Sequence, residues 1–435
     1  EYRRALERGS LEISGSATRS GKIRTVEPQV ERDPEETRGH IFAKGAYSLR
    51  SDWFAGLDIN VASDRSYLGN YGFSRAYEAT DIASRYRGQS HLTNQLFLER
   101  AVDRSYSNIG AVAFQSLNPE IDLKTVPYLL PVGTYSYKGI PSERGDYWLV
   151  DANMRILGRE LGTQSRRVVM KGAWRLPYTS RLGVKYSFNL GLRADGYHVS
   201  RFPDPQVIGE TLGGFEGRIL PEMYLDWQFP FARPAGSGLV VLEPIGQIVW
   251  RPNGGNKERI PNEDSLAFEF DDLNLFSVDR FPGLDRYEGG ARINYGLRSE
   301  IHSVFLPGAE VLVGQVLRAK VDDTYRDGTG LNQSFSDIVG RFTISPGRLI
   351  SLVHRFRLDR KNLATRSSSF RAALGPEWLN GAVHYMKLSD GPADGLPVSL
   401  EQINLSFRQR IVTNWYWRFF HERDLGQSGG ALSNS

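Results

Sequence analysis

The 435 residues contain no cysteine, which excludes disulfides, thiolate metal sites and cysteine nucleophiles from this stretch of chain. No run of apolar residues approaches the roughly 18–20 that a membrane-spanning helix requires. The excess of positive over negative charge is also small. The net charge is +4 and the isoelectric point is about 9.0, which is too mild to indicate nucleic-acid binding. The mean hydropathy of -0.40 is typical of a soluble chain, but a transmembrane β-barrel also averages out as polar.

Motifs for catalysis are almost absent. The seven histidines show neither an H-E-x-x-H pattern nor zinc-ligand spacing, and neither a Walker A motif nor a Rossmann fingerprint occurs. One G-x-S-x-G match at Gly426–Gly430 lies in a Ser/Gly-rich tail with no helix after it, so we interpret it as accidental. We therefore expect no catalytic residue, no metal, no cofactor and no enzymatic activity.

What the sequence does contain is long alternation of apolar and polar residues. In residues 181–193 every even-numbered residue is apolar and every odd-numbered residue is glycine or polar. Period two predicts a β-strand, and a dozen residues is longer than the usual strand of about five or six. A tilted strand needs about ten residues and one polar face to cross a bilayer as part of a barrel.

Similar alternation predicts about nineteen strands and no convincing amphipathic helix. We expect an all-β fold, a large antiparallel transmembrane β-barrel of the outer-membrane type, with residues 1–435 forming a single barrel domain. The predicted strands are 11–19, 41–50, 52–62, 93–102, 106–117, 124–137, 146–157, 166–176, 181–193, 217–230, 239–251, 288–299, 308–319, 335–345, 348–358, 367–375, 377–388, 399–411 and 414–422.

The predicted connections alternate between short and long, as the periplasmic turns and extracellular loops of outer-membrane barrels do. We therefore expect the short turns on the periplasmic side and the long loops on the extracellular side. The short connections are 50–51, 103–105, 177–180, 233–238, 345–347, 375–376 and 413, and the long ones are 63–92, 194–216, 252–287, 320–334 and 389–398.

Residues 259–296 combine many acidic side chains with four phenylalanines. A solvated loop would not carry so many large apolar residues, because burying each phenylalanine is worth about 1.5–3 kcal/mol. Three interpretations remain open: a loop packed on itself or on strand ends, a functional loop folded into a barrel lumen, or a calcium site. No D-x-[DN]-x-[DN]-G loop is present to favour calcium.

In this stretch the sequence resembles the lipopolysaccharide-assembly (LptD) family of Gram-negative outer membranes. The family pattern N-E-D-S, F-E-F-D-D-x-N-L-F, R-F-x-G-L-D-R-x-E and R-x-N-Y-G-L occupies residues 262–265, 268–276, 280–288 and 292–297. A second family pattern, W-x-x-G-x-D-x-N-x-x-S-D-R-x-Y-L-x-x-Y-G-F, lies at residues 53–73, and the family's L-E-P lies at residues 242–244.

The resemblance marks two sets of candidate residues, one in a lumen-facing loop and one after an early strand. The loop set is Asn262, Asp264, Phe270, Asp271, Asp272, Asn274, Phe276, Arg280, Phe281, Gly283, Asp285, Arg286 and Glu288. The second set is Trp53, Asp58, Asn60, Ser63, Asp64, Tyr67 and Leu68.

The resemblance also implies an architecture: a barrel of twenty-six strands, preceded by a periplasmic jelly roll and plugged by the lipoprotein LptE. We therefore expect these residues to be an excerpt of a larger barrel, incomplete at both ends, with the jelly roll and terminal strands absent. An unclosed barrel exposes two strand edges, so we expect that the excerpt does not fold alone.

The function implied is an outer-membrane translocon that inserts lipopolysaccharide into the outer leaflet. Its implied partners are lipopolysaccharide, LptE, outer-membrane lipids and the periplasmic bridge protein LptA, reached through the absent N-terminal domain, with no nucleic acid. Arg155, Arg175, Lys185 and Arg193 are possible lumen cations for lipopolysaccharide phosphates, although inward charge is also ordinary barrel lining. The alternative function is a porin or a TonB-type nutrient transporter with the same kind of barrel.

Overall fold

The computed structural model is nearly all β. It describes residues 2–20, 23–26, 29–32, 35–50, 52–71, 91–204, 207, 209–236, 238–265, 269–303, 307–321, 324–325, 327–347, 349–376, 378–389, 399–412, 415–426 and 430–434. The strands are β1 (Tyr2–Leu6), β2 (Gly9–Ser20), β3 (Ile23–Val26), β4 (Gln29–Arg32), β5 (Glu36–Ser48), β6 (Trp53–Ala62), β7 (His91–Val102), β8 (Ser105–Ser116), β9 (Tyr128–Lys138), β10 (Tyr147–Gly158), β11 (Gln164–Thr179), β12 (Lys185–Pro203), β13 (Thr211–Gln228), β14 (Phe231–Ala235), β15 (Gly238–Trp250), β16 (Arg292–His302), β17 (Pro307–Arg318), β18 (Ile338–Ile344), β19 (Ile350–Leu358), β20 (Thr365–Leu374), β21 (Leu379–Ser389), β22 (Ser399–Val412), β23 (Trp415–Asp424) and β24 (Gly430–Asn434).

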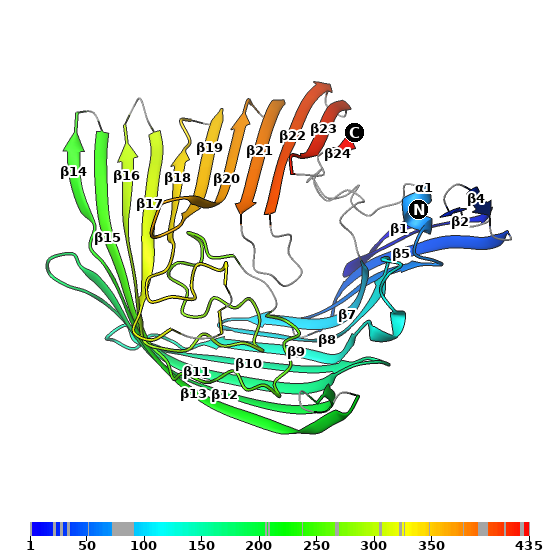
Figure 1. The fold of residues 1–435 in the computed structure, drawn as a ribbon, viewed down its shortest axis with the longest axis horizontal. Helices are drawn as coiled ribbons and strands as arrows, with labels where there is room; N and C mark the ends of the chain where they lie inside the picture. The colour runs from blue at the N-terminus through cyan, green and yellow to red at the C-terminus, as the bar shows by residue number, and fades with distance from the viewer. Residues whose placement is uncertain are drawn as a thin grey trace.

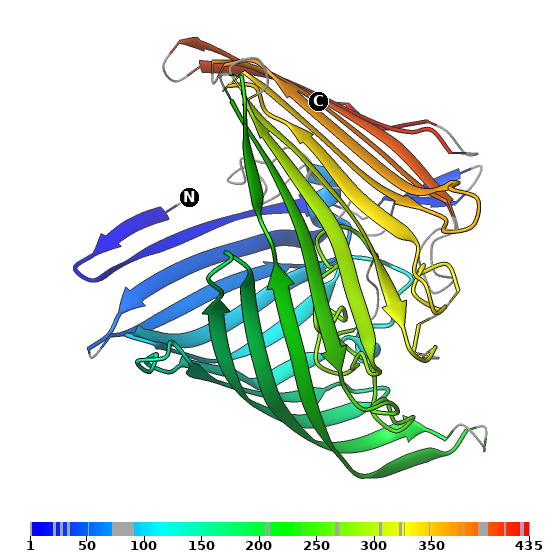
Figure 2. The ribbon, with the colours of Figure 1, turned by 90° about the vertical axis from the view of Figure 1, so that its left-hand side faces the viewer.

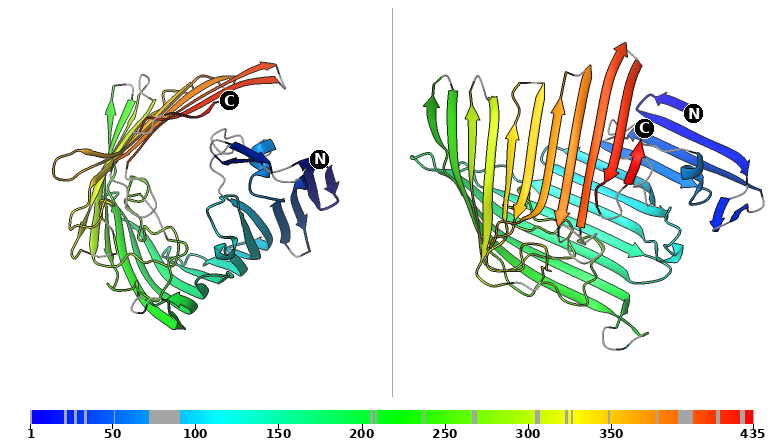
Figure 3. Two further views of the ribbon diagram at one scale, coloured as in Figure 1. Left: turned by 45° about the vertical axis from the view of Figure 1, so that its right-hand side comes forward. Right: turned by 45° about the horizontal axis from the view of Figure 1, so that its top comes forward.

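Twenty-two of these strands form one antiparallel sheet, and β3 with β4 form a separate hairpin. Each strand of the large sheet pairs with its neighbour in sequence, with two exceptions. Strand β2 pairs directly with β5, and β13 and the short β14 both pair with β15, along different parts of its length. The sheet curls into an open C in cross-section, with its first and last strands on opposite sides of the opening (Figure 1 and Figure 3, left). Figure 2 shows the same sheet from its side.

The two faces of the sheet differ in polarity. On β12, Leu190 and Leu192 point outward and are 49% and 51% exposed, whereas Asn189 and Arg193 point to the concave side and are 2% and 4% exposed. Exposed leucines and buried arginines are the reverse of a soluble protein and the pattern of an outer-membrane barrel strand. The predicted fold class, an antiparallel barrel-type sheet, is confirmed.

All nineteen predicted strands exist, with ends that differ by a few residues, and β1, β3, β4, β14 and β24 are additional. The predicted long loop 194–216 is wrong, because β12 continues to Pro203 and β13 begins at Thr211. The outward residues of this extension are not apolar, so the alternation fades there. Its inward Tyr197 and Val199 are nevertheless buried against Ile260 of a distant loop, and that contact stabilises the extension.

The antiparallel order brings successive connections alternately to the two ends of the sheet, and the longest connections all lie at the same end. The turn end carries 7–8, 49–52, 103–104, 139–146, 180–184, 236–237, 303–306, 345–349, 375–378 and 413–414. The loop end carries 21–35, 63–90, 117–127, 159–163, 204–210, 251–291, 319–337, 359–364, 390–398 and 425–429. Parts of these connections lie outside the described residues, namely 21–22, 27–28, 33–34, 51, 72–90, 205–206, 208, 237, 266–268, 304–306, 322–323, 326, 348, 377, 390–398, 413–414 and 427–429.

Helical structure is limited to short turns, α1 (Tyr67–Tyr71) and a 3-10 turn at Leu123–Thr125. Within the ranges given above, the chain contains no helix long and apolar enough to span a membrane. The main buried apolar cluster lies where two long connections meet the concave face, and consists of Phe270, Leu275, Val316, Tyr325, Leu331 and Val339.

Candidate functional site

The connection from β15 to β16, residues 251–291, lies on the concave side of the sheet, and we call it the docked loop (Figure 1 and Figure 3, left). Its Phe270 and Leu275 are completely buried and pack against Val316 and Val339 of β17 and β18. Phe281 stacks on Tyr325 with ring centroids 5.4 Å apart. Packing therefore accounts for the aromatic residues, and this packing occurs on the inward face of the sheet. Phe268 of the family pattern lies outside the described residues.

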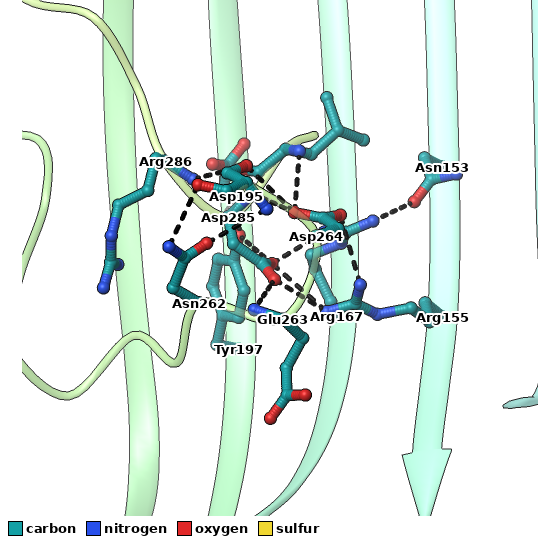
Figure 4. A network of polar contacts seen from close by, with 12 residues as sticks. Asn153, Arg155, Arg167, Asp195, Tyr197, Asn262, Glu263, Asp264, Asp285 and Arg286 are labelled. Carbon is teal, nitrogen blue, oxygen red and sulfur yellow. Dashed lines mark hydrogen bonds and ion pairs between the residues drawn. The ribbon is translucent and has the colours of Figure 1, made fainter. Parts of the chain in front are cut away.

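Two carboxylates, Asp264 and Asp285 from the two halves of the docked loop, anchor the loop to β10 and β11 (Figure 4). Asp285 is fully buried, and its carboxylate oxygens lie 2.9 Å from Arg155 Nη2 and 2.6 Å from Arg167 Nη1. Asp264 Oδ2 shares the same guanidinium groups, at 3.1 Å from Arg155 Nη1 and 2.5 Å from Arg167 Nη1. Asp285 also accepts hydrogen bonds from the amide of Glu263 at 2.9 Å and from Tyr197 OH at 3.3 Å. Two charges of each sign, of which only Asp264 is partly exposed, thus satisfy one another.

A second group of strand arginines holds the backbone of the loop. Asp195 of β12 forms ion pairs with Arg193, at 2.8 Å, and with Arg218 of β13, at 2.5 Å. Both arginines also donate to the carbonyl oxygen of Leu284, at 2.8 Å in the case of Arg218. Asp195 neutralises one of the two positive charges, and both guanidinium groups also hold the neutral carbonyl group of the loop.

The turn at Gly283 allows the two halves of the loop to approach each other. A Cβ atom on Gly283 would lie 2.2 Å from Asp264 Oδ1 and 2.4 Å from the Asp264 carbonyl oxygen, which no real side chain tolerates. With glycine there, Asp264 Oδ1 accepts hydrogen bonds from the amides of Leu284 and Asp285, at 3.1 and 3.0 Å. The family pattern therefore requires glycine at this position for a steric reason.

A second charged centre lies where the docked loop joins β16. Glu288 is fully buried and forms ion pairs with Arg280 at 2.5 Å, with Arg292 at 3.4 Å and with Arg318. Arg280 also donates to the Leu275 carbonyl oxygen at 2.7 Å, which ties this centre to the apolar cluster. One carboxylate thus neutralises part of the charge of three guanidinium groups from the loop, β16 and β17.

Both centres depend on ionised carboxylates. Burial opposes ionisation of Glu288, but Arg280, Arg292 and Arg318 outweigh it and lower its pKa from 4.5 to about 2. Burial likewise opposes ionisation of Asp264, and Arg167 outweighs it and holds the pKa of that carboxyl well below its usual range.

We predict from these shifts that docking of the loop is acid-sensitive. A carboxyl whose folded-state pKa is lowered stabilises the fold fully above its unfolded-state pKa, and this contribution is lost as the pH falls through the folded-state value. For Glu288 that window runs from pH 4.5 down to about 2. Amide hydrogen exchange of the loop in detergent should therefore show constant protection between pH 7 and 5 and decreasing protection below 4.5. Protection that is lost already above pH 5 would contradict this assignment.

A third contact reaches β18 and β19. The Asp272 carboxylate, which is buried, lies 3.1 Å from Arg341 and 3.2 Å from Arg355. Burial raises the pKa of Asp272 although both arginines act in the opposite direction. Its neighbour Asp271 is different, because its Oδ1 accepts the amides of Leu273 and Asn274, at 2.9 and 3.2 Å, and so closes a local turn. Only one of the two adjacent aspartates therefore connects the loop to the sheet.

The remaining family residues of the loop maintain its internal shape. Asn262 exchanges two hydrogen bonds with the backbone of Ser265, at 3.0 and 3.1 Å. Arg286 donates to the Ile260 carbonyl oxygen at 2.9 Å. Phe276 packs on the main apolar cluster. The structure thus brings the predicted loop residues together, but no contact observed here assigns them a function.

The second family pattern forms the turn after β6. Arg38 is 2% exposed and makes two hydrogen bonds of 2.8 Å with Asp64, while Ser63 Oγ accepts the amide of Gly39 at 3.0 Å. The Arg38 hydrogen bond holds the pKa of Asp64 well below its usual range. Tyr67 and Leu68 begin α1 and are buried in a cluster with Phe42, Ala62 and Leu92.

The earlier residues of this pattern lie on β6. Asn60 donates to Asp58 Oδ1 at 2.9 Å and to the Thr93 carbonyl oxygen at 2.7 Å, and Trp53 is half-buried at the start of the strand. These contacts join β6 to β7. The pattern as a whole therefore fixes a corner of the sheet near its first strands.

The four possible lumen cations have different environments. Arg155 and Arg193 are buried and hold the docked loop, as described above. Arg175 donates to Asn189 and to Tyr224 OH at 2.9 Å, and Lys185 is exposed at the first residue of β12. A role in binding lipopolysaccharide phosphates remains a prediction, and the two buried arginines are already engaged by the loop.

Sequence reasoning missed several arginines that bind the docked loop, namely Arg167, Arg218, Arg251, Arg292, Arg318 and Arg341. A usable signal was present, because Arg167 and Arg218 occupy inward positions of predicted strands in the same alternation as Arg155 and Arg193. Among the described residues, no group of three or more His, Asp or Glu side chains is arranged to hold a metal.

Comparisons with known proteins identify relatives of this chain. A model of the LptD family, described as LPS transport system D, matches residues 36–415. An LPS-assembly protein LptD of Nitrosococcus oceani is 23% identical over 318 residues, which are 68% of this chain and 39% of that protein. The chain thus spans 39% of the length of this curated relative. Among solved structures, the siderophore receptor PirA of Pseudomonas aeruginosa matches with a TM-score of 0.45 and 9% identity, over 96% of this chain and 77% of that one.

Proposed function

The chain belongs to the LptD family, LPS transport system D, and we propose that it forms wall strands of an outer-membrane translocon that inserts lipopolysaccharide into the outer leaflet. This family is a transport and assembly family rather than an enzyme family. The 435 residues are one part of a larger barrel, which in the complete protein follows a periplasmic jelly roll.

The observation that carries the proposal is a sheet with an apolar convex face and a concave face lined by charge, on which the docked loop is bound by arginines. Lipopolysaccharide has acyl chains and a phosphorylated saccharide. Its transfer requires a polar interior for the saccharide and an apolar exterior that is compatible with lipid. A loop fixed inside the sheet at three charged contacts leaves room for a polar path while occupying part of the lumen.

The partners follow from the same proposal. LptE, the plug lipoprotein, contacts the docked loop from the lumen, where Leu273 projects from the loop surface and is 65% exposed. LptA delivers lipopolysaccharide to the jelly roll, and outer-membrane lipids cover the convex face. The proposed location is the bacterial outer membrane.

Depletion of the protein tests the function directly. Surface lipopolysaccharide, measured by modification on intact cells, should decrease while newly made lipopolysaccharide accumulates in the periplasm or inner membrane. Unchanged surface lipopolysaccharide, together with a loss of uptake of a small nutrient, would instead favour a porin or TonB-type transporter.

We further predict that the turn end is periplasmic and the loop end extracellular. Arg181 and Glu258 are both exposed, one on the β11–β12 turn and the other on the docked loop. No cysteine in the 435 residues competes for the reagent.

In intact cells a membrane-impermeant maleimide should label Glu258→Cys and leave Arg181→Cys unlabelled. Both variants should react once the outer membrane is permeabilised, which controls for the accessibility of each thiol. Labelling of Arg181→Cys alone on intact cells would reverse the proposed orientation.

A further inference from the structure

A polar pocket of about 640 Å³ lies at the loop end of the sheet, and we call it the rim pocket. Its walls come from the connections 319–337 and 359–364 and from the ends of the strands that they join. Among the described residues that line it, none belongs to the docked loop. The rim pocket is therefore a different feature from the charged centres described above.

The carboxylates of the rim pocket already have partners. Asp337 Oδ2 lies 3.2 Å from Arg357 Nη1, and Asp359 Oδ2 lies 2.8 Å from Arg366 Nη2. The other oxygen of Asp359 accepts the amide of Lys361 at 2.8 Å, and the Arg366 hydrogen bond is the main cause of a lowered pKa of about 2 for Asp359. Each of these two acids is paired with a neighbouring arginine, and the third carboxylate of the pocket, that of Asp327, accepts a hydrogen bond from the Asn332 side chain.

Two cations of the rim pocket have no such partner. Arg360 and Lys361 follow Asp359 in the β19–β20 turn and line the pocket, and within the described part of the chain neither side chain forms an ion pair. Lys361 is exposed and Arg360 is half-buried. Adjacent unneutralised cations at the mouth of a pocket favour an anionic ligand, because guanidinium and ammonium groups donate charge-assisted hydrogen bonds to phosphate.

The other walls suit a saccharide. The amide side chains of Asn332 and Asn362 line the pocket. Asn332 donates to Asp327 and Asn362 Oδ1 accepts the amide of Ala364 at 3.0 Å, which leaves the Asn332 oxygen as an acceptor and the Asn362 nitrogen as a donor for hydroxyl groups. Phe335 provides an apolar wall that is 45% exposed. Gly330, at φ +74°, shapes the opposite wall, since a Cβ atom there would lie 2.6 Å from Asp337 Oδ2.

The position of Phe335 points to the source of the ligand. Phe335 forms an isolated antiparallel β-bridge with Leu317 at the end of β17. Leu317 in turn pairs with Ile293 of β16, whose side chain faces outward. The rim pocket therefore adjoins the apolar convex face of the sheet, at its loop end. In the proposed orientation this is the level of the head groups of the outer leaflet.

We propose that the rim pocket binds the phosphorylated saccharide head group of a lipopolysaccharide molecule in the outer leaflet. Arg360 and Lys361 hold a phosphate, and Asn332 and Asn362 hold sugar hydroxyls. The proposal rests on the proposed function, because that function supplies the ligand and the orientation of the sheet.

The test uses full-length protein in phosphatidylcholine nanodiscs that contain bis-phosphorylated lipid A, with binding measured by native mass spectrometry. The double variant Arg360→Ala/Lys361→Ala should bind lipid A about tenfold or more weakly, as expected when hydrogen bonds to charged groups are lost. The matched control Lys124→Ala/Lys320→Ala removes two exposed lysines of the loop end that do not line the pocket, and it should bind like the wild type. Dephosphorylated lipid A should bind the wild type as weakly as lipid A binds the double variant.

Each other outcome overturns part of the proposal. Equal lipid A binding by wild type and double variant would eliminate the rim pocket and leave the proposed function intact. If the free bis-phosphorylated disaccharide, without acyl chains, binds as tightly as lipid A, the ligand is a soluble phosphosugar and the outer-leaflet source is wrong. Absence of lipid A binding by the wild type, with normal surface lipopolysaccharide after depletion, would overturn both the pocket and the function.

Discussion

Replacing Asp285 with alanine is expected to release the docked loop from the sheet and to destabilise the protein by about 3–5 kcal/mol. The Asp285 carboxylate is completely buried and touches both Arg155 and Arg167. Without it, Asp264 is, within the described part of the chain, the one carboxylate left in an ion pair with the two buried guanidinium groups. An unpaired buried charge costs far more than a surface ion pair.

The effect of Asp285→Ala should be measured in full-length protein by thermal unfolding in detergent and by limited proteolysis of the loop. In cells we expect weaker co-purification of LptE and greater sensitivity to large antibiotics, since the loop occupies part of the lumen. Asp271→Ala is the matched control, because this acid of the same loop accepts only local amides. It should cost about 0.5–2 kcal/mol, comparable to the loss of a helix cap.

Equal effects of Asp285→Ala and Asp271→Ala would contradict the account, because only one of the two carboxylates holds strand arginines. Proteolytic sensitivity confined to the loop, with the sheet intact, would separate undocking from global unfolding. Asp285→Asn adds a further comparison, since it keeps the shape of the side chain and removes only its charge.

The strands could be predicted from the sequence because alternation is a local property. On β12 the outward leucines and inward polar residues follow period two, and the structure reproduces that division. The extension of β12 beyond residue 193 could not be predicted in this way. There the strand is held by Tyr197 and Val199 against Ile260, a residue of the docked loop that is far away in sequence.

The charged site shows the same limit. Four phenylalanines among acidic residues indicated a loop that is not simply solvated, and in the structure Phe270, Phe276 and Phe281 do pack on the concave side of the sheet. The identity of the cations could not be derived, because Arg167 and Asp264 are 97 residues apart and meet only when the loop folds onto the concave face. The short β14, Phe231–Ala235, was missed because five residues with no alternation give no strand signal.

The largest effect is expected for Glu288→Gln, at the junction of the docked loop and β16. Glu288 is the shared carboxylate of Arg280, Arg292 and Arg318, all of which are almost completely buried. Glutamine keeps one acceptor oxygen but removes the charge, so three buried guanidinium groups are left to repel one another. We expect destabilisation on the order of 5 kcal/mol and little assembled protein in the membrane.

A double-mutant cycle can show that charge is the cause. Arg318→Gln removes one of the three cations, so in the Glu288→Gln background it should restore part of the lost stability, whereas alone it should be destabilising. Glu258→Gln, at an exposed position of the same loop, is the matched control and should change stability by less than about 0.5 kcal/mol. Thermal unfolding of the four proteins in detergent gives the coupling energy. If the effects of Glu288→Gln and Arg318→Gln simply add, the two side chains are not coupled and the charged centre does not fix the loop to β16 and β17.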